Sequence, residues 1–353
     1  MGENKKIDSD KLIKIAILLI LGVSIALSYN LIKARTLISA EADKYFPPWT
    51  NLGYVILSTF FCWVFKGSLI YLTCDPITRI YKKQNKKSEE FYLKKIINYI
   101  PNMIWYIIMV ILGYGFVGIG NKRVPDTLGG SLRYTDKYFS DWPKTTYNFY
   151  ESIYFYLQFG YKLFSLFETL FFKRNIGDFW EMIFHHLMAC VLMFLSYFIN
   201  WWDFGIVILL IHDPGDLSVV LAKVYQYIVP KRMKHTLIDV VLGITCLTTF
   251  ILPRVFIQIF SIFWRGFNNV YIDNYLYRNE SKNLVPLEAK NALFPIQQFM
   301  FLMLALLSIL NLYWSYIMLT FLFAFFSKRE IKTQHGYIKK DQEDLREDSN
   351  KEK

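Results

Sequence analysis

The sequence predicts an all-α, polytopic membrane protein with about eight transmembrane helices. Of its 353 residues, 54% are hydrophobic and 18% are aromatic, and the mean hydropathy is +0.25. Soluble domains are usually about 45–50% apolar even when glycine is counted. The apolar residues form long blocks without the roughly ten-residue alternating segments of a barrel, which favours spanning helices. This composition excludes an ordinary soluble enzyme, a disordered chain and a repeat solenoid.

A spanning helix needs about 20 largely apolar residues, and several segments of the chain meet this requirement. They are residues 12–33, 51–73, 97–120, 146–172, 181–201, 205–229, 236–264 and 294–326. The first follows a lysine-bearing tail, but it is longer than a signal-peptide core and lacks an A-x-A cleavage site, so we expect a retained anchor. The last is long enough to tilt or to extend past the bilayer.

Lysine and arginine in the connections predict the orientation, because the cytoplasmic loops of membrane proteins are enriched in them. The 74–96 connection holds seven and the tail after residue 326 holds eight, whereas the 202–204 connection holds none. Eight spans then place both termini and the 74–96 connection in the cytosol. The sequon at Asn279 falls on the luminal side, where we expect glycosylation.

The net charge of +11 predicts contact with the lipid bilayer and no nucleic-acid partner, because the basic residues lie between apolar runs and face anionic headgroups there. The four cysteines show no paired spacing, so we expect neither a disulfide framework nor a cysteine metal site. Residues 327–353 are highly charged and predict a disordered cytosolic tail.

Ionisable residues inside spans are costly and mark functional candidates, and here they concentrate in the fifth and sixth spans. At about 100° per residue, each of these spans carries its polar side chains on one stripe. The stripes hold Asp178, His185 and Ser196 in the fifth span, and His212, Asp216 and Lys223 in the sixth. A short connection makes these helices antiparallel neighbours, so we expect both stripes to face one interior. Pro214 and Gly215 should loosen the sixth span and free backbone carbonyls.

Two other interpretations of these stripes stay open on the residues alone. The first is a buried polar network that only fastens helices together. The second, a metal site, is weaker, because the chain lacks the HxxxH and HxxHH boxes of membrane di-iron enzymes. No GxSxG, SxxK, HExxH, Walker loop or GxGxxG is present either. The pattern therefore favours histidine–carboxylate chemistry on a lipid, with no metal.

These residues resemble the signature of the ceramide synthases in the TLC-domain superfamily. The resemblance rests on His185-His186 and, after a 25-residue gap, His212-Asp213 with Asp216. Flanking matches are Asp178-Phe-Trp-Glu181-Met, Ser196-Tyr197, Asn200, Gly205, Lys223 and Tyr225, with weaker echoes at Trp142-Pro143, Arg254 and Trp314. The chain departs from the pattern where the family commonly has arginine, an acidic residue and histidine, at Asp203, Val220 and Asn311.

The resemblance implies a domain organisation and a site. Residues 1–87 would hold a tail, two spans and a basic loop, and residues 88–326 would form a TLC catalytic domain of six helices around an intramembrane cavity. The implied catalytic residues are His185, His186, His212, Asp213 and Asp216. The implied substrate-binding residues are Ser196, Asn200, Lys223, Arg254 and Trp314. We expect His185 to be the general base or nucleophile, with Asp216 orienting its ring.

The implied reaction transfers a fatty acyl group from acyl-CoA to the amino group of a sphingoid base, in the endoplasmic reticulum membrane. Acyl-CoA would be a co-substrate, and no cofactor is implied. The CoA group should dock from the cytosol at Lys173-Arg174 or at the basic residues 231–234, and residues 265–293 would influence acyl length. A homo- or hetero-dimer and a small accessory subunit are both open. The rival predictions are a non-catalytic TLC protein, acting at the translocon or as a lipid sensor, and a proton-relay transporter.

Overall fold

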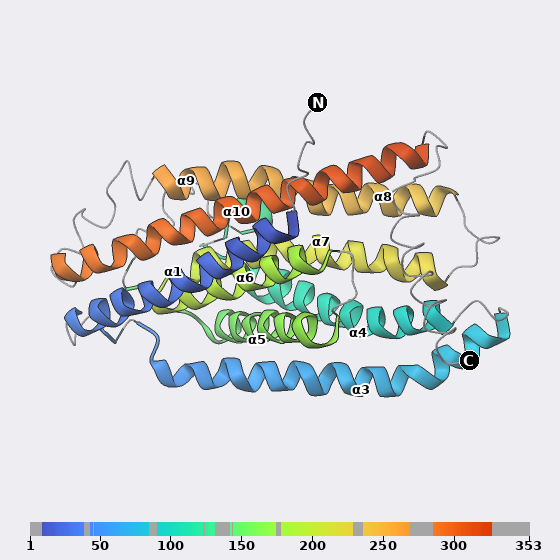
Figure 1. Ribbon diagram of the computed structural model, residues 1–353, viewed down its shortest axis with the longest axis horizontal. Coiled ribbons are helices and arrows are strands. Elements are labelled where there is room, and N and C mark those ends of the chain that lie inside the picture. Colours follow the sequence, from blue (N-terminus) through green and yellow to red (C-terminus); the bar gives the residue numbers. More distant parts are fainter. Residues whose placement is uncertain are drawn as a thin grey trace, which may run out of the picture.

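The computed structural model describes residues 9–38, 43–44, 46–84, 90–122, 124–130, 142, 144–173, 178–228, 236–268 and 285–326. The elements within these ranges are helices, and the long ones run side by side along the long axis of the molecule (Figure 1). The α-helices are α1 (Ser9–Leu37), α3 (Leu52–Gln84), α4 (Glu90–Leu112), α5 (Phe149–Phe172), α6 (Phe179–Phe198), α7 (Trp202–Ile228), α8 (Thr236–Ile251), α9 (Trp264–Phe267) and α10 (Leu287–Phe326). Two π-helical segments, η2 (Gly113–Gly118) and η6 (Leu252–Phe263), continue α4 and α8. The predicted all-α fold is confirmed.

Seven of the described helices are long and apolar enough to cross a membrane, one fewer than the sequence predicts. The segment that differs is α5, the fourth predicted span. It has 24 residues, about 36 Å of helix at 1.5 Å per residue, and it runs inside the bundle (Figure 1). Its buried residues include Glu151, Gln158 and Lys162, which lower its hydropathy. The fourth predicted span is therefore a largely aromatic helix with buried polar residues, and it packs against α3, α6 and α7.

The predicted 74–96 connection is wrong in its extent. Helix α3 continues to Gln84 and α4 begins at Glu90, so most of the basic stretch is helical. The prediction ended the span where the apolar residues end, but lysine and arginine are good helix formers and do not stop a helix. At the other end of the chain, α10 has 40 residues. At about 60 Å it is longer than the hydrocarbon core of a bilayer.

Helix α7 lies at the centre of the bundle, in contact with α4, α5, α6, α8 and η6. The two helices that precede the implied catalytic domain flank it on different sides. Helix α1 packs against α10 and α6, and α3 packs against α5 and α4 (Figure 1). One large apolar cluster of buried residues holds the bundle together.

The start of α5 is fixed by a capping box. The side chain of Asn148 accepts a hydrogen bond from the Glu151 amide, and Glu151 accepts one from the Asn148 amide. Two of the orphan amides at this helix start are thereby satisfied. Further along, Gly160 allows α3 to approach closely, since a Cβ there would lie 2.5 Å from the Cβ of Ser58. These two features set the depth and the spacing of α5 in the bundle.

Candidate active site

The turn between α6 and α7 fixes the antiparallel pair that carries the histidines. Asn200 has a φ of 59°, a left-handed conformation that asparagine tolerates better than most residues. Its side-chain amide donates to the Thr145 carbonyl at 3.2 Å, and the Trp142 indole donates to the Ile199 carbonyl at 2.8 Å. These bonds join the turn to the segment that precedes α5, and the structure does not bring Asn200 to the histidines. Its expected contact with substrate stays a prediction that these bonds argue against.

A proline inside α7 shapes the segment that follows His212. Pro214 has no N–H to donate to the carbonyl of Leu210, four residues earlier. The Tyr114 hydroxyl of η2 donates to that carbonyl instead, at 2.8 Å. The next residue, Gly215, leaves room for Arg254, because a Cβ at 215 would lie 3.2 Å from the Arg254 Nε. The proline and glycine of the motif thus open α7 to partners from two other segments, as the sequence predicts.

Three histidines meet where α6 faces α7. The ring centre of His185 lies 5.4 Å from that of His186 and 6.4 Å from that of His212. The indole of Trp314, on α10, lies 5.1 Å from the His185 ring. All three histidines are buried. The Nδ1 atoms of His185 and His186 have no hydrogen-bond partner among the described residues.

The tautomer of neutral His212 follows from its contacts. Its Nδ1 lies 2.7 Å from the Ile208 carbonyl, and a carbonyl only accepts hydrogen bonds, so Nδ1 carries the proton. Its Nε2 then holds a lone pair, and the Asn311 amide nitrogen lies 3.5 Å from it. Asn311 also donates to Gln258 at 3.1 Å. His212 is therefore oriented to accept a proton at Nε2.

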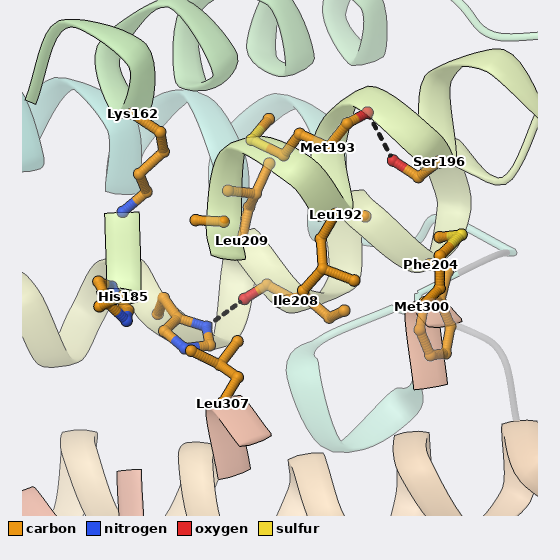
Figure 2. A pocket seen from close by; sticks show the side chains of 13 residues that line it. Lys162, His185, Leu192, Met193, Ser196, Phe204, Ile208, Leu209, Met300 and Leu307 are labelled. Atoms are coloured by element: carbon orange, nitrogen blue, oxygen red, sulfur yellow. Dashed lines mark hydrogen bonds between the residues drawn. The ribbon is translucent and has the colours of Figure 1, made fainter. Parts of the chain in front are cut away.

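A pocket opens beside these histidines (Figure 2). His185 and Lys162 border one end of it, and Ser196, Phe204 and Met300 lie at the other. His212 also lines the pocket. The remaining wall is almost entirely apolar, formed by Ala189, Leu192, Met193, Gly205, Ile208, Leu209 and Leu307. His186 is not among the lining residues. Of the paired histidines, His185 is the one with access to this space.

Asp216 is held by two cations. The Arg254 guanidinium on η6 donates to its Oδ1 and, at 2.6 Å, to the carbonyl of His212. The Lys162 ammonium on α5 lies 3.7 Å from its Oδ2. The expectation that Asp216 holds the His185 ring is not met by a hydrogen bond, since the bonds described for Asp216 go to Arg254. Asp216 instead binds Arg254 and forms a long ion pair with Lys162 beside the pocket.

Asp213 is fully buried and bound from α5. Its Oδ2 accepts hydrogen bonds from the Tyr154 hydroxyl at 2.6 Å and from the Gln158 amide at 2.5 Å. These donors bind a carboxylate that α7 presents to α5, so Asp213 joins the two helices. Asp213 directly follows His212 in the sequence, but it does not line the pocket.

The sequence analysis missed the contribution of α5. Tyr154, Gln158 and Lys162 follow each other at intervals of four, so they share one face of the helix, and that face meets Asp213 and Asp216. The rule applied to the fifth and sixth spans would have found this stripe in the fourth.

The remaining predicted substrate-binding residues differ in whether they lie at the pocket. Ser196 and Trp314 lie at the pocket or beside His185, whereas the Lys223 ammonium lies over the Tyr99 ring, 5.4 Å from its centre.

Several predicted positions lie outside the described residues. They are Asn279, Arg174, residues 231–234 and the tail 327–353. Lys173 is described, and its ammonium lies 2.7 Å from the Glu168 carboxylate. Within the described ranges, no group of three or more histidine, cysteine, aspartate or glutamate residues is arranged to hold a metal ion. The donor set at the pocket is suited to acid–base and nucleophilic chemistry next to an apolar chain.

The chain was compared with known families and proteins. The model of the TLC domain matches residues 95–320. The ASC1-like protein 3 of Oryza sativa subsp. japonica is 25% identical over 188 residues, which are 53% of this chain and 63% of that protein. The ceramide synthase 4 of Bos taurus is 24% identical over 182 residues, which are 51% of this chain and 40% of that one. The sphingosine N-acyltransferase lag1 of Schizosaccharomyces pombe is 30% identical over 93 residues, which are 26% of this chain and 24% of that protein.

The chain thus spans less than two thirds of the length of these relatives. The match to the domain model is broader, because it extends from α4 to α10. The matched range includes α6 and α7, which carry His185, His186 and His212. It also includes η6 with Arg254 and α10 with Trp314. A family assignment rests on that extent and not on any single pairwise identity. The chain belongs to the TLC domain family.

Proposed function

We propose that this protein is a ceramide synthase, which transfers the acyl group of a fatty acyl-CoA to the amino group of a sphingoid base. The observation that carries the proposal is His185, a buried histidine at the polar end of an apolar pocket, 6.4 Å from the ring of His212. Relatives named ceramide synthase and sphingosine N-acyltransferase support this choice of reaction. The apolar wall is suited to an acyl chain, and the polar end to its thioester.

In the proposed mechanism, an imidazole nitrogen of His185 attacks the thioester carbonyl carbon. The carbon–sulfur bond then breaks, and the sulfur leaves with the electron pair of that bond. It takes up the N–H proton of the acylated His185 ring, which leaves free CoA and a neutral acyl-imidazole. The amine attacks the acyl-imidazole, a carbon–nitrogen bond forms, and His185 leaves with its electron pair. The lone pair on His212 Nε2 accepts the amine proton. That proton is then returned to the His185 ring, so that both histidines are neutral at the end of the cycle. This sequence replaces one difficult acyl transfer by two easier steps.

The proposal extends to substrates and location. The CoA group is too polar for lipid and would approach from the cytosol, where Lys173, Arg174 and residues 231–234 are candidate phosphate contacts. The sphingoid base would enter from the bilayer. The protein is a multi-pass membrane protein, and we propose the endoplasmic reticulum as its membrane. Acyl-CoA serves as co-substrate without a further cofactor, and a homo- or hetero-dimer or a small accessory subunit is compatible with this scheme.

The experiment that tests the function is an assay of membranes carrying the protein. A panel of acyl-CoAs is supplied with sphinganine, and ceramide is measured by mass spectrometry. Product that depends on both substrates and disappears in His185→Ala supports the proposal. No product with any acyl-CoA, from protein that is inserted and folded, contradicts it and favours a non-catalytic TLC protein.

A second measurement separates the covalent route from direct attack. With acyl-CoA alone, the covalent route releases a burst of CoA of up to about one equivalent per site, and mass spectrometry finds the acyl group on His185. Sphinganine then discharges it into ceramide. In direct attack, no CoA appears until the amine arrives, and His185 acts as the general base. Absence of both burst and adduct in an active preparation therefore assigns the base role.

A further inference from the structure

Lys162 is a charged group that borders the proposed reaction site and has no role in the mechanism above. It lies on α5, its residue is 4% exposed, and its ammonium points toward His185 at the polar end of the pocket (Figure 2). A buried lysine inside a membrane bundle is costly. Its position at the pocket calls for a physical explanation.

The ammonium is only loosely held by protein groups. Its ion-pair partner, Asp216 Oδ2, lies 3.7 Å away, beyond the roughly 2.7–3.2 Å of an N–H···O hydrogen bond. Asp216 already accepts a hydrogen bond from Arg254. An ammonium has three N–H donors, and the Lys162 ammonium donates no hydrogen bond to another described residue. The donors of Lys162 are therefore available to a molecule in the pocket.

Two other polar groups of the pocket, Ser196 and His212, have their hydrogens committed. The Ser196 hydroxyl donates to the Met193 carbonyl at 3.0 Å, and His212 Nδ1 lies 2.7 Å from the Ile208 carbonyl. His185 must present a lone pair in either version of the proposed reaction. Among the described side chains that line the pocket, Lys162 is left as the cationic donor.

We propose that Lys162 is a catalytic residue that stabilises the oxyanion formed during acyl transfer. The inference rests on the proposed acyl-transfer function. As the nucleophile bonds to the thioester carbon, the π electron pair of the carbonyl moves to oxygen, which becomes negatively charged. The Lys162 ammonium donates a hydrogen bond to that oxygen and keeps its proton. When the carbonyl forms again, the carbon–sulfur bond breaks and CoA leaves. A fixed donor at this point stabilises the transition state more than the ground state.

A second buried lysine in the same bundle provides a matched control. Lys66 on α3 is 6% exposed and pairs with Glu168 of α5 at 2.5 Å. It does not line the pocket. Lys66→Met removes a buried ammonium while Glu168 keeps its other partner, Lys173, at 2.7 Å. The control therefore reports the general effect of deleting a buried lysine from this fold.

The kinetic test compares Lys162→Met, Lys162→Arg and Lys66→Met in ceramide formation. Loss of an oxyanion donor should lower kcat by about 10²–10³-fold with little change in the KM for acyl-CoA. Lys162→Arg, which keeps a cationic donor, should recover part of the rate, and Lys66→Met should leave kcat unchanged. A kcat for Lys162→Met that matches Lys66→Met would overturn the proposal.

A binding test does not depend on the amine substrate. The probe is a difluoroketone analogue, R–CF₂–C(O)–CH₂–S–CoA, whose carbonyl adds a nucleophile but cannot expel CoA, so it retains the oxyanion. The reference ligand has CH₂ in place of that carbonyl. Wild type and Lys66→Met should prefer the ketone, and Lys162→Met should lose that preference while binding the reference normally. The quantity compared is the ratio of the affinities for the ketone and for the reference ligand. If Lys162→Met does not fold, the same ratio is measured for Lys162→Gln.

The outcomes separate the two proposals. A wild type that prefers the ketone but makes no ceramide retains the oxyanion site and contradicts the sphingoid-base function. A wild type that makes ceramide, with the ketone preference intact in Lys162→Met, contradicts the role of Lys162 alone. A wild type with neither property contradicts both.

Discussion

Helix α5 takes part in two charged clusters, each with a buried lysine, and the clusters differ in how completely their charges are paired. Toward α3, both carboxylate oxygens of Glu168 are bound, one by Lys66 at 2.5 Å and one by Lys173 at 2.7 Å. Toward α7, Lys162 lies 3.7 Å from Asp216 and borders a pocket. A buried lysine is common to both clusters, so it does not distinguish a functional site from an ion pair that only stabilises helix packing. The feature that distinguishes the site is an incompletely paired donor, Lys162, that faces a pocket.

The largest expected effect breaks the cluster that faces the pocket. His185→Ala should lower the rate of ceramide formation by about 10²–10⁴-fold, because it removes the base or nucleophile. Asp216→Ala should act in the same direction by releasing Arg254 and Lys162, which it holds beside the pocket. Membranes with matched amounts of each variant are assayed for ceramide by mass spectrometry. Wild-type rates in both variants would show that the pocket is not the reaction site.

The second prediction sharpens the comparison on the α3 face. Glu168→Leu leaves the Lys66 ammonium buried without its partner, and breaking a buried pair in this way costs about 3–5 kcal/mol. Thermal unfolding of the purified protein in detergent should show a clear loss. The double variant Lys66→Met/Glu168→Leu removes both charges and should recover much of it. A double variant no more stable than Glu168→Leu would contradict the pairing.

The third prediction concerns the close approach of α3 to the same face of α5. Gly160→Val should destabilise the protein by about 1–3 kcal/mol, since a Cβ there would lie 2.5 Å from the Cβ of Ser58 and 2.7 Å from its backbone carbon. Thermal unfolding measures the loss. Gly53→Val is a suitable control, because a Cβ at Gly53 meets nothing within 4 Å. Equal effects of the two substitutions would mean that the contact at Gly160 contributes little.

The sequence predicted what periodicity and motif spacing encode. Long apolar runs gave the helices, and the stripes of α6 and α7 brought His185 and His212 together. Periodicity does not reveal which element lies opposite a stripe, so the partner of Asp216 was assigned to His185 and proved to be Arg254. The polar stripe on α5 was overlooked because the segment was judged by its overall hydropathy. Helix ends near residue 84 were missed because charge ends an apolar run without ending a helix.

The smallest expected effect is on topology. Asn279 should carry a glycan when the protein is made in microsomes, and Asn279→Gln should abolish the shift in electrophoretic mobility without changing ceramide formation. The stretch that joins α3 to α4 should be cleaved by protease added outside sealed microsomes, whereas residue 279 is protected. Cytosolic exposure of residue 279 would mean that α5 does not cross the bilayer and that the chain has seven spans instead of eight.

The packing of α10 has a consequence for how the protein is made. Trp314 lies against His185, and the Asn311 amide lies 3.5 Å from His212 Nε2. Helix α10 also packs against α1. The first described helix to be synthesised therefore makes this contact only after the last one has been synthesised. Until synthesis has passed about residue 314, His185 and His212 lack these neighbours. The proposed activity thus requires completed assembly, and we expect a nascent or prematurely terminated chain to lack it.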